Sequence, residues 1–385
     1  MISRIGWILW AASAAAFAAG AVASAPLIAV GERAWPVLLF ALSITLVADN
    51  AARAGVFTSV ADRLSRLARG RRRVLLASVV ALAVACTTFL SLDTTAVLLT
   101  PVMVMLARRT RSDVFPFAFA TVWIANTASL TLPVSNLTNL LASHRLGQPS
   151  PLSWLRGMAV PSLAAIAVTA VALAIMGRRT LRGRYEPVTA VEPPDLALWR
   201  VAMVVLAVLV PTLLLPIPPW IPATAAAIAL IVAAKVRKRA GAPYRSWWRD
   251  APWSLLVFAS GLFMAGGVLE ATLLPRLQLP VLPTGPVGVI VASAIGLVAA
   301  NVFDNLPAYL ALESLTQLDL HVRAVLIGVN VGPLITPWGS LATLLWHRQL
   351  TTLDVEVSWR RYVRWGVVLA PAAVAAAAVA LVVAP

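Results

Sequence analysis

The feature that most constrains this chain is a series of long apolar stretches without a charged residue. The charge-free stretches are 5–31, 34–48, 74–92, 94–107, 114–144, 157–177, 201–234, 251–269, 277–303, 324–347 and 365–385. A membrane-spanning helix needs about 20 consecutive apolar residues. Stretch 201–234 is long enough for two spans, with a turn predicted at Pro216, Pro218 and Pro219. The chain is 60% hydrophobic and 12% charged, which excludes a soluble domain and a disordered chain. The sequence therefore predicts an all-α polytopic membrane protein.

The basic residues lie in short clusters between these stretches, and their distribution orients the chain. With the N-terminus inside the cell, 26 of the 31 basic residues fall inside and five fall outside. Cytoplasmic loops carry an excess of Lys and Arg, so we expect a plasma (inner) membrane protein with a cytoplasmic N-terminus and an external C-terminus. The Arg-rich loop 53–73 is expected to meet anionic head groups of the lipid bilayer. No nucleic-acid partner is expected, because the loops account for the basic charge.

Two segments leave one face of the membrane and return to it. Segment 74–107 has Asp93 in its middle, and segment 286–318 has Asp304 in its middle. Each segment is either two short spans or one re-entrant hairpin with a polar tip, and loop charge does not separate these possibilities. A carboxylate at each tip favours the hairpin, because a polar tip is tolerated where it is buried in protein or faces water.

The two halves of the chain share a motif. Residues 126–141 read NTASLTLPVSNLTNLL, and residues 330–345 read NVGPLITPWGSLATLL. Asn, Leu, Pro, a small residue and a Leu-x-x-Leu-Leu ending coincide without gaps, and Asp93 and Asp304 precede the motifs in the same order. The first unit starts inside and the second starts outside. We therefore expect two inverted-topology repeats, each with a re-entrant hairpin and a Pro-broken transmembrane helix, as in secondary transporters.

This repeat defines the expected domain organisation. The expected units are an N-terminal transmembrane helix (1–33), a first transport repeat (34–177), a linker with two transmembrane helices (178–250) and a second inverted transport repeat (251–385).

A solute site is expected where the helices break at Pro133 and Pro337, because Pro lacks a backbone donor and clashes with the preceding turn. Freed backbone groups and nearby polar side chains suit a small polar solute or an ion near the membrane midplane. The alternative is that the hydroxyl groups only bond to helix carbonyls or tighten helix packing. The candidate solute-binding residues are Ser91, Thr94, Thr95, Asn126, Thr127, Ser129, Ser135, Asn136, Asn305, Asn330, Thr336, Gly339 and Ser340.

Acidic residues at membrane depth are stronger evidence for a functional site than the neutral polar residues are. An ionised Asp at the centre of a span costs at least about 2.5–3.5 kcal/mol on insertion scales, so Asp93 and Asp304 either titrate, pair or face water. Titration makes both of them candidate proton-coupling residues. Asp49 and Glu270 lie at the ends of stretches and are weaker candidates. We expect neither a metal site nor a cofactor, because the single Cys86 and three scattered His residues offer no ligand cluster.

Two motif blocks carry a family resemblance. Residues 124–139 and 331–346 resemble the signature of the ArsB-type arsenite/antimonite efflux permeases of the ion transporter superfamily, which share a citrate transporter-like domain. The resemblance implies proton-driven export of the neutral trihydroxides of As(III) and Sb(III), in some members with a cytoplasmic ATPase subunit. In that family an acidic residue is usual at the position of Asp93, whereas Asp304 stands where the second hairpin usually has Asn.

The residues favour a proton-coupled secondary transporter for trivalent metalloids rather than an enzyme. The alternative within the superfamily is a sodium/proton antiporter or a carrier of a small organic or inorganic anion. The tips and broken helices contain no Lys or Arg, which disfavours tight carboxylate binding but leaves sodium open. An intramembrane enzyme would need a nucleophile–base pair or metal ligands at membrane depth. A passive channel is disfavoured by the hairpin-and-repeat pattern, and ATP hydrolysis by the lack of a Gly-rich phosphate loop.

Overall fold

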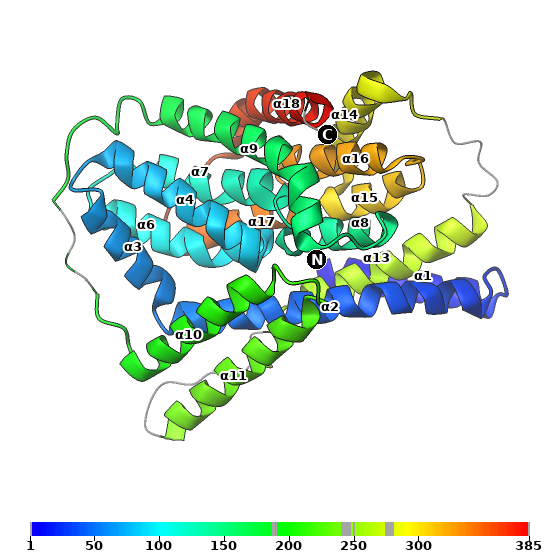
Figure 1. The fold of residues 1–385 in the computed structure, drawn as a ribbon, viewed down its shortest axis with the longest axis horizontal. Coiled ribbons are helices and arrows are strands. Elements are labelled where there is room, and N and C mark those ends of the chain that lie inside the picture. The colour runs from blue at the N-terminus through cyan, green and yellow to red at the C-terminus, as the bar shows by residue number, and fades with distance from the viewer. Residues whose placement is uncertain are drawn as a thin grey trace.

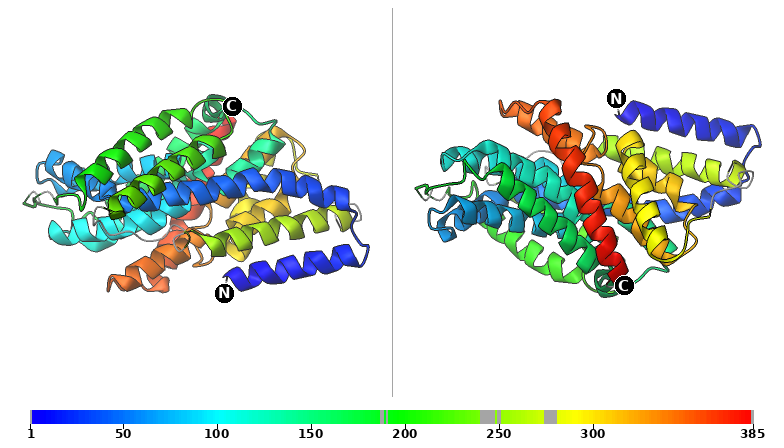
Figure 2. Two further views of the ribbon diagram at one scale, coloured as in Figure 1. Left: turned by 90° about the horizontal axis from the view of Figure 1, so that it is seen from below. Right: turned by 90° about the horizontal axis from the view of Figure 1, so that it is seen from above.

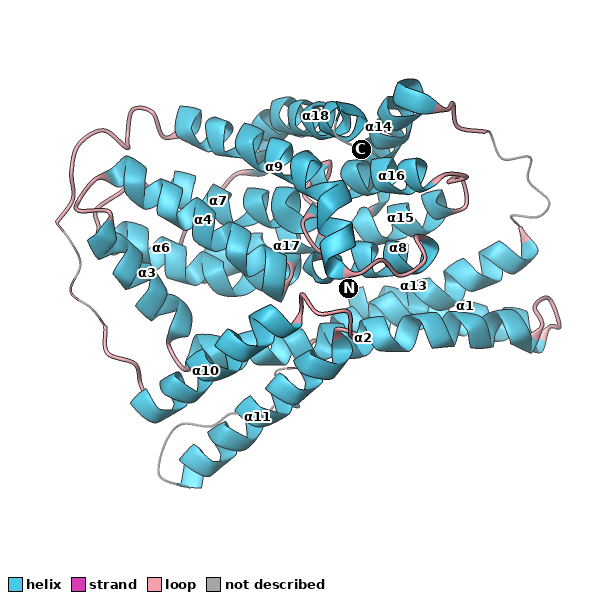
Figure 3. Ribbon diagram, in the orientation of Figure 1, coloured by secondary structure: helices cyan, strands magenta, loops and turns pink. Residues whose placement is uncertain are grey.

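The computed structural model describes residues 2–186, 189, 191–239, 248, 251–273 and 281–383. Within these ranges the chain is helical throughout, and its one β-bridge joins Arg71 and Arg184 (Figures 1 and 3). Seven of the described helices are long and apolar enough to cross a membrane. The expected class, an all-α polytopic membrane protein, is confirmed.

Four long helices form one side of the molecule. They are α1 (Ile2–Ala18), α2 (Ser24–Arg53), α11 (Trp220–Arg239) and α13 (Trp253–Thr272). Helix α1 packs along α13, and α2 contacts both α11 and α13 (Figure 2). The predicted turn in stretch 201–234 is confirmed, because α10 (Leu196–Thr212) ends before the three prolines and α11 begins after them.

The start of the chain differs from the expectation. Stretch 5–31 is not one span, because the chain turns between α1 and α2. The expected domain boundary at residue 33 falls inside α2, which continues from Ser24 to Arg53. Glu32 and Arg33 do not end this helix, since the guanidinium of Arg33 forms an ion pair with Glu313. A paired charge can remain within a continuous helix, and charge counting alone does not detect the pairing.

The first hairpin follows α3 (Val56–Leu67) and has α4 (Arg72–Leu90) as its entering limb. The chain reverses at Ser91 and returns through α5 (Leu92–Thr94), a π-helical turn (Thr95–Leu99) and α6 (Thr100–Arg109). The second hairpin consists of α14 (Gly285–Phe303), a reversal at Asp304 and α15 (Asn305–Glu313). In Figure 1 the limbs of the first hairpin extend to the left end of the molecule and those of the second to the right.

The two reversals correct the expected pairing of the carboxylates. Helices α4 and α14 both have 19 residues, and each ends on a residue with positive φ, 87° at Ser91 and 86° at Asp304. The backbone therefore matches Asp304 with Ser91, and Asp93 lies two residues beyond the first tip. The sequence comparison paired the two acids by residue type, whereas the position of the chain reversal decides which residues are equivalent.

Each hairpin is followed by a broken helix. In the first, α7 (Val114–Thr127) is separated from α8 (Leu137–Arg145) by two short 3-10 turns. In the second, α16 (Asp319–Val331) is separated from α17 (Leu341–Thr352) by a non-helical segment. The second half-helices start after Asn136 and Ser340, which have nearly the same extended backbone angles. These breaks contain Pro133 and Pro337.

The remaining long helices, α9 (Pro151–Met176) and α18 (Trp359–Val383), pack against each other. Close packing in the second unit depends on Gly328, because a Cβ atom there would lie 2.3 Å from the backbone oxygen of Ser293 and 2.7 Å from Cα of Gly296. This contact holds α16 directly against α14 and so positions the second break beside the second tip.

Candidate functional site

The hairpins and broken helices converge at the centre of the molecule. Helix α17 of the second unit packs against α5, the π-helical turn and α6 of the first hairpin. Helix α8 of the first unit packs against α15 and α16 of the second. Each second half-helix therefore contacts the opposite unit, and the two units together enclose one polar region.

The two acidic candidates face this region in different ways. The carboxyl group of Asp304 accepts a hydrogen bond from the backbone N–H of Leu306 at 3.2 Å, and the N–H of Leu341 at the start of α17 lies beside it. Asp93 makes no hydrogen bond within the described part of the chain, and its charge acts repulsively on Asp304. Two carboxyl groups are thus brought close enough to interact, one of them anchored by backbone N–H groups and the other not.

Asp93 borders a small cavity between the first tip and α2. The cavity measures about 20 Å³ and is lined by Ser91, Asn136, Phe40 and Leu255 among others. A polar cavity of this size has room for about one water molecule. Asp93 therefore borders a space large enough for a water molecule.

An amide cluster joins the two units on one side of the region. The Oδ1 atom of Asn330 accepts from Nδ2 of Asn136 at 3.0 Å and from Oγ1 of Thr138 at 2.7 Å. Its Nδ2 atom donates to Oδ1 of Asn139 at 2.7 Å. All four residues are buried. Asn330 and Asn136 are therefore brought together as expected, but their amide groups bind each other.

Several buried polar atoms of the candidate residues have no hydrogen-bond partner. Among the described residues these include Oδ1 of Asn126, Nδ2 of Asn305 and Oγ of Ser340. A buried polar group without a hydrogen bond is costly, about 1–3 kcal/mol. One acceptor, one donor and one hydroxyl group of the candidate residues thus have no partner within the described part of the chain. Ser340 precedes α17, next to the N–H group of Leu341 that faces Asp304.

Several candidate hydroxyl groups bond to the protein itself, as the alternative interpretation anticipated. Thr95 donates to the carbonyl of Ser91, Thr127 to that of Trp123 and Ser129 to that of Asn126. The hydroxyl of Ser91 donates to that of Thr94 at the first tip. The hydroxyl of Ser135 donates to the carbonyl of Thr88 and so ties the first break to the first hairpin.

The second break is tied to its hairpin by Asn301, a residue that the sequence reasoning missed. Its Nδ2 donates to the carbonyl of Gly332 at 2.8 Å, and its Oδ1 accepts from the N–H of Thr336 at 2.9 Å. Thr336 also donates through its hydroxyl to the carbonyl of Asn301. A Cβ atom at Gly339 would lie 3.1 Å from Oδ1 of Asn301. An amide one turn before the Asp304 tip, in an otherwise apolar helix, was the available signal.

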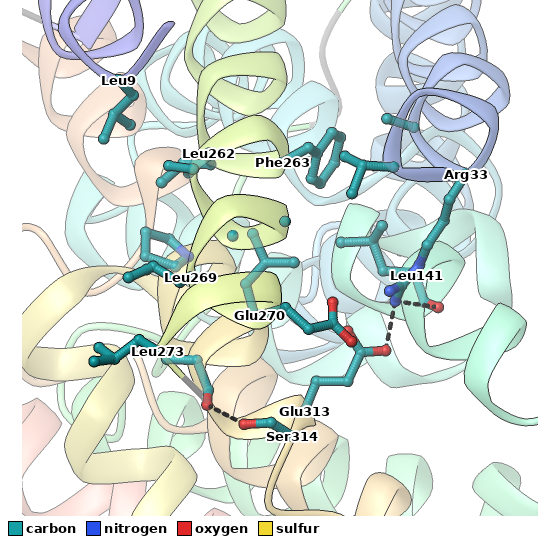
Figure 4. A pocket seen from close by; sticks show the side chains of 18 of the residues that line it. Leu9, Arg33, Leu141, Leu262, Phe263, Leu269, Glu270, Leu273, Glu313 and Ser314 are labelled. Atoms are coloured by element: carbon teal, nitrogen blue, oxygen red, sulfur yellow. Dashed lines mark hydrogen bonds and ion pairs between the residues drawn. The ribbon is translucent and has the colours of Figure 1, made fainter. Parts of the chain in front are cut away.

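The weaker acidic candidates lie on α2 and α13. Asp49 forms an ion pair with Arg53 at 2.9 Å. Glu270 lines a cavity of about 600 Å³ between α2, α13 and α15, where Arg33 binds Glu313 and donates to the carbonyl of Leu141 (Figure 4). Among the described residues, no group of three His, Cys, Asp or Glu side chains is placed to hold a metal ion.

Comparison with known proteins identifies the family of this chain. The model of the family described as citrate transporter (CitMHS) matches residues 5–328. The chain belongs to the citrate transporter family. Within the ion transporter superfamily it resembles the arsenical pump membrane protein of Escherichia coli, with 29% identity over 95% of this chain and 90% of that protein. The arsenical pump membrane protein of Yersinia enterocolitica shows the same identity and coverage. The resemblance seen in the two motif blocks is confirmed.

A solved structure supports the fold of this citrate transporter family member. The YdaH transporter of Alcanivorax borkumensis, described as having an unusual topology, superposes with a TM-score of 0.57 at 14% sequence identity. The match covers 90% of this chain and 84% of that one. At this identity the likeness establishes a shared fold.

Proposed function

We propose that this protein is a secondary transporter that exports arsenite and antimonite across the plasma membrane in exchange for protons. The observation that carries the proposal is the set of unpartnered neutral polar atoms on Asn305 and Ser340 next to the Asp304 carboxyl group, together with a third such atom on Asn126. A neutral trihydroxide presents hydroxyl groups that both donate and accept hydrogen bonds, and it needs no fixed counter-charge. The similarity to arsenical pump membrane proteins supports the same substrate class.

Two acidic residues support proton coupling. Moving one proton through the membrane potential releases about 2.3 kcal/mol per 100 mV, so one titrating carboxyl group is enough to couple transport usefully. We assign this role to Asp93, which borders a cavity and makes no hydrogen bond within the described residues. Asp304, anchored by the N–H of Leu306, tunes the site or carries a second proton.

The test is uptake of arsenite into everted membrane vesicles with and without an imposed proton gradient. Gradient-dependent uptake that is abolished by a protonophore is the expected result. The assay is first run without ATP, so that any contribution of a cytoplasmic ATPase subunit would appear as an ATP-dependent increase. Uptake that ignores the gradient would contradict the coupling, and absence of arsenite uptake would contradict the substrate.

Cells provide a second test of substrate class. Expression in a metalloid-sensitive bacterium should raise tolerance of arsenite and antimonite but leave tolerance of arsenate unchanged in a strain without arsenate reductase. Arsenate is an anion, and no Lys or Arg lies at the two tips or in the breaks between the half-helices, residues 128–136 and 332–340. Reporter fusions to the two termini test the proposed orientation, in which the N-terminus is cytoplasmic and the C-terminus external.

A second candidate is a carrier of a small carboxylate anion. Two observations favour it, the citrate transporter family match and the position of Arg33 and Arg145 in the 600 Å³ cavity that reaches Pro307 near the second tip. Arg33 is already engaged by Glu313, which weakens this candidate. Gradient-driven citrate uptake by vesicles that do not transport arsenite would establish it, and sodium-dependent proton movement would instead indicate sodium/proton exchange.

A further inference from the structure

A second polar surface lies far from the transport site, at the end of the molecule where α4 begins and α9 ends (Figure 1). Three chain segments bring basic side chains together there. The arginines of this cluster are Arg71, Arg72, Arg73, Arg111, Arg178, Arg179, Arg182 and Arg184. All of them except Arg72 are exposed.

Backbone interactions hold this arginine cluster together against its own repulsion. The guanidinium of Arg72 donates to the carbonyls of Arg111 at 3.1 Å and Arg182 at 3.4 Å. Arg71 and Arg184 form a β-bridge, and the N–H of Tyr185 donates to the carbonyl of Gly70 at 2.8 Å. The positive charges are therefore gathered by the fold rather than by contacts with acids.

The neighbouring acids are engaged elsewhere or unpaired. Asp62 binds Arg109 at 2.7 Å, and Asp113 caps α7 through the N–H of Phe115. Glu186 makes no ion pair within the described part of the chain. None of the ion pairs formed by described residues involves an arginine of the cluster. The Nε of Arg72 is buried without an acceptor. The cluster thus has the charge and the free donors to bind an anion.

A cavity within the cluster has an apolar floor. It measures about 200 Å³ and is lined by Arg73, Arg178, Leu76, Ala174 and Leu181. Arg73 lies in the first turn of α4, and Arg178 follows the end of α9. Two guanidinium groups at the ends of two long apolar helices, above an apolar groove between them, match a phosphate joined to an acyl chain. Basic pockets between transmembrane helices bind anionic lipid head groups in this way.

We infer that this cavity is a binding site for one anionic phospholipid, with its phosphate between Arg73 and Arg178 and its proximal acyl chain along Leu76, Ala174 and Leu181. The exposed donors of Arg179 and Arg182 surround the head group. Such a lipid offsets the repulsion within the cluster and ties the first hairpin to α9. The site is independent of the transported solute.

The test measures binding of phosphatidylglycerol to the purified full-length protein by native mass spectrometry, with phosphatidylcholine as the neutral lipid. Arg73→Gln combined with Arg178→Gln should weaken the tightest phosphatidylglycerol adduct about 30-fold, because each basic residue near an anionic surface contributes a factor of about five. The matched control, Arg348→Gln combined with Arg360→Gln, removes the same charge from two exposed arginines outside the cluster. It should leave that adduct unchanged.

A third variant changes the shape of the cavity and leaves its charge unchanged. Ala174→Trp fills the groove and retains every arginine, so it should also weaken the phosphatidylglycerol adduct. Equal loss in the control pair, or full retention in Ala174→Trp, would overturn a defined site in favour of diffuse charge attraction. Inorganic phosphate or glycerol phosphate that displaces the lipid at equal concentration would show that the site takes a free phosphate, which would also overturn the inference.

Discussion

The two broken helices use the same framework for different purposes. In the first, Asn136, Thr138 and Asn139 at the start of α8 bind the amide of Asn330 from the second unit. In the repeat alignment the residue that corresponds to Asn330 is Asn126, and the positions at the start of α17 are Ser340, Ala342 and Thr343. There the Oδ1 of Asn126 and the Oγ of Ser340 have no partner.

This difference indicates why unpartnered polar atoms remain in one half and not in the other. Three polar side chains on α8 saturate one amide and fasten the two units together. On α17 a hydroxyl and a methyl group replace two of these partners, and the Oγ1 of Thr343 instead lies 3.3 Å from the hydroxyl of Tyr362. In the proposed function, the polar atoms that the protein leaves unsatisfied near Asp304 bind the solute. We therefore expect substitutions around α8 to change stability and substitutions around α17 to change transport.

Removing the saturated amide should have the largest effect. Asn330→Ala deletes three buried hydrogen bonds between the units, and interhelical bonds in membrane proteins contribute roughly 0.6 to 1.7 kcal/mol each, so we expect a loss of about 2 to 5 kcal/mol. Thermal unfolding of the purified protein in detergent measures it. The matched variant Asn126→Ala loses one bond, to the carbonyl of Val122 in its own helix, and should unfold nearly as the unmodified protein does. Equal destabilisation by both variants would contradict the division of roles.

The two carboxyl groups should differ in coupling. Asp93→Asn keeps shape and hydrogen-bonding capacity but cannot release a proton, so gradient-driven efflux should fall to background while arsenite exchange across vesicles continues. Asp304→Asn should retain efflux with an altered pH dependence, because the Asn side chain can still accept from the N–H of Leu306. Full proton-driven efflux by Asp93→Asn would remove its assignment. Loss of efflux in Asp304→Asn alone would transfer the role to the second tip.

A substitution that gives the start of α17 the amide found at the start of α8 tests the comparison further. Ser340→Asn places at the start of α17 the amide that Asn136 supplies at the start of α8. The new amide should occupy the polar space beside Asn126, raising the unfolding temperature slightly and reducing arsenite transport several-fold. Ser340→Ala should reduce the apparent affinity for arsenite without raising stability. Transport that is unchanged in both variants would show that the unpartnered atoms do not contact the solute.

Much of this architecture was predictable from the sequence, but few of its hydrogen bonds were. Pro133 and Pro337 predict the breaks because Pro has no backbone N–H donor and therefore interrupts the helix at its own position, which can be read from the sequence. The reversal at Ser91 was not predictable from residue type, since any residue that tolerates positive φ could have made the turn. The same limit applies to hydroxyl groups. Thr127 and Ser340 are equally polar in the sequence, but the first bonds to its own helix and the second precedes a helix, so only the three-dimensional arrangement separates them.

A surface ion pair provides the baseline for these comparisons. Asp195 caps α10 and accepts from Nε of Arg237 at 2.7 Å, and this bond, together with the backbone N–H groups it caps, lowers the pKa of the carboxyl group. Because the folded pKa is the lower one, the stabilisation is present above the ordinary value of about 4 and is lost as the pH falls through the folded value.

Asp195→Asn keeps the cap but loses the charge. Its unfolding temperature should fall by about 2 °C or less at pH 7, as expected for a surface ion pair, and the difference from the unmodified protein should disappear once the pH falls below the lowered pKa of Asp195. Arsenite transport should not change. A larger effect than that of Asn330→Ala would mean that α10 and α11 contribute more to stability than the polar region between the units.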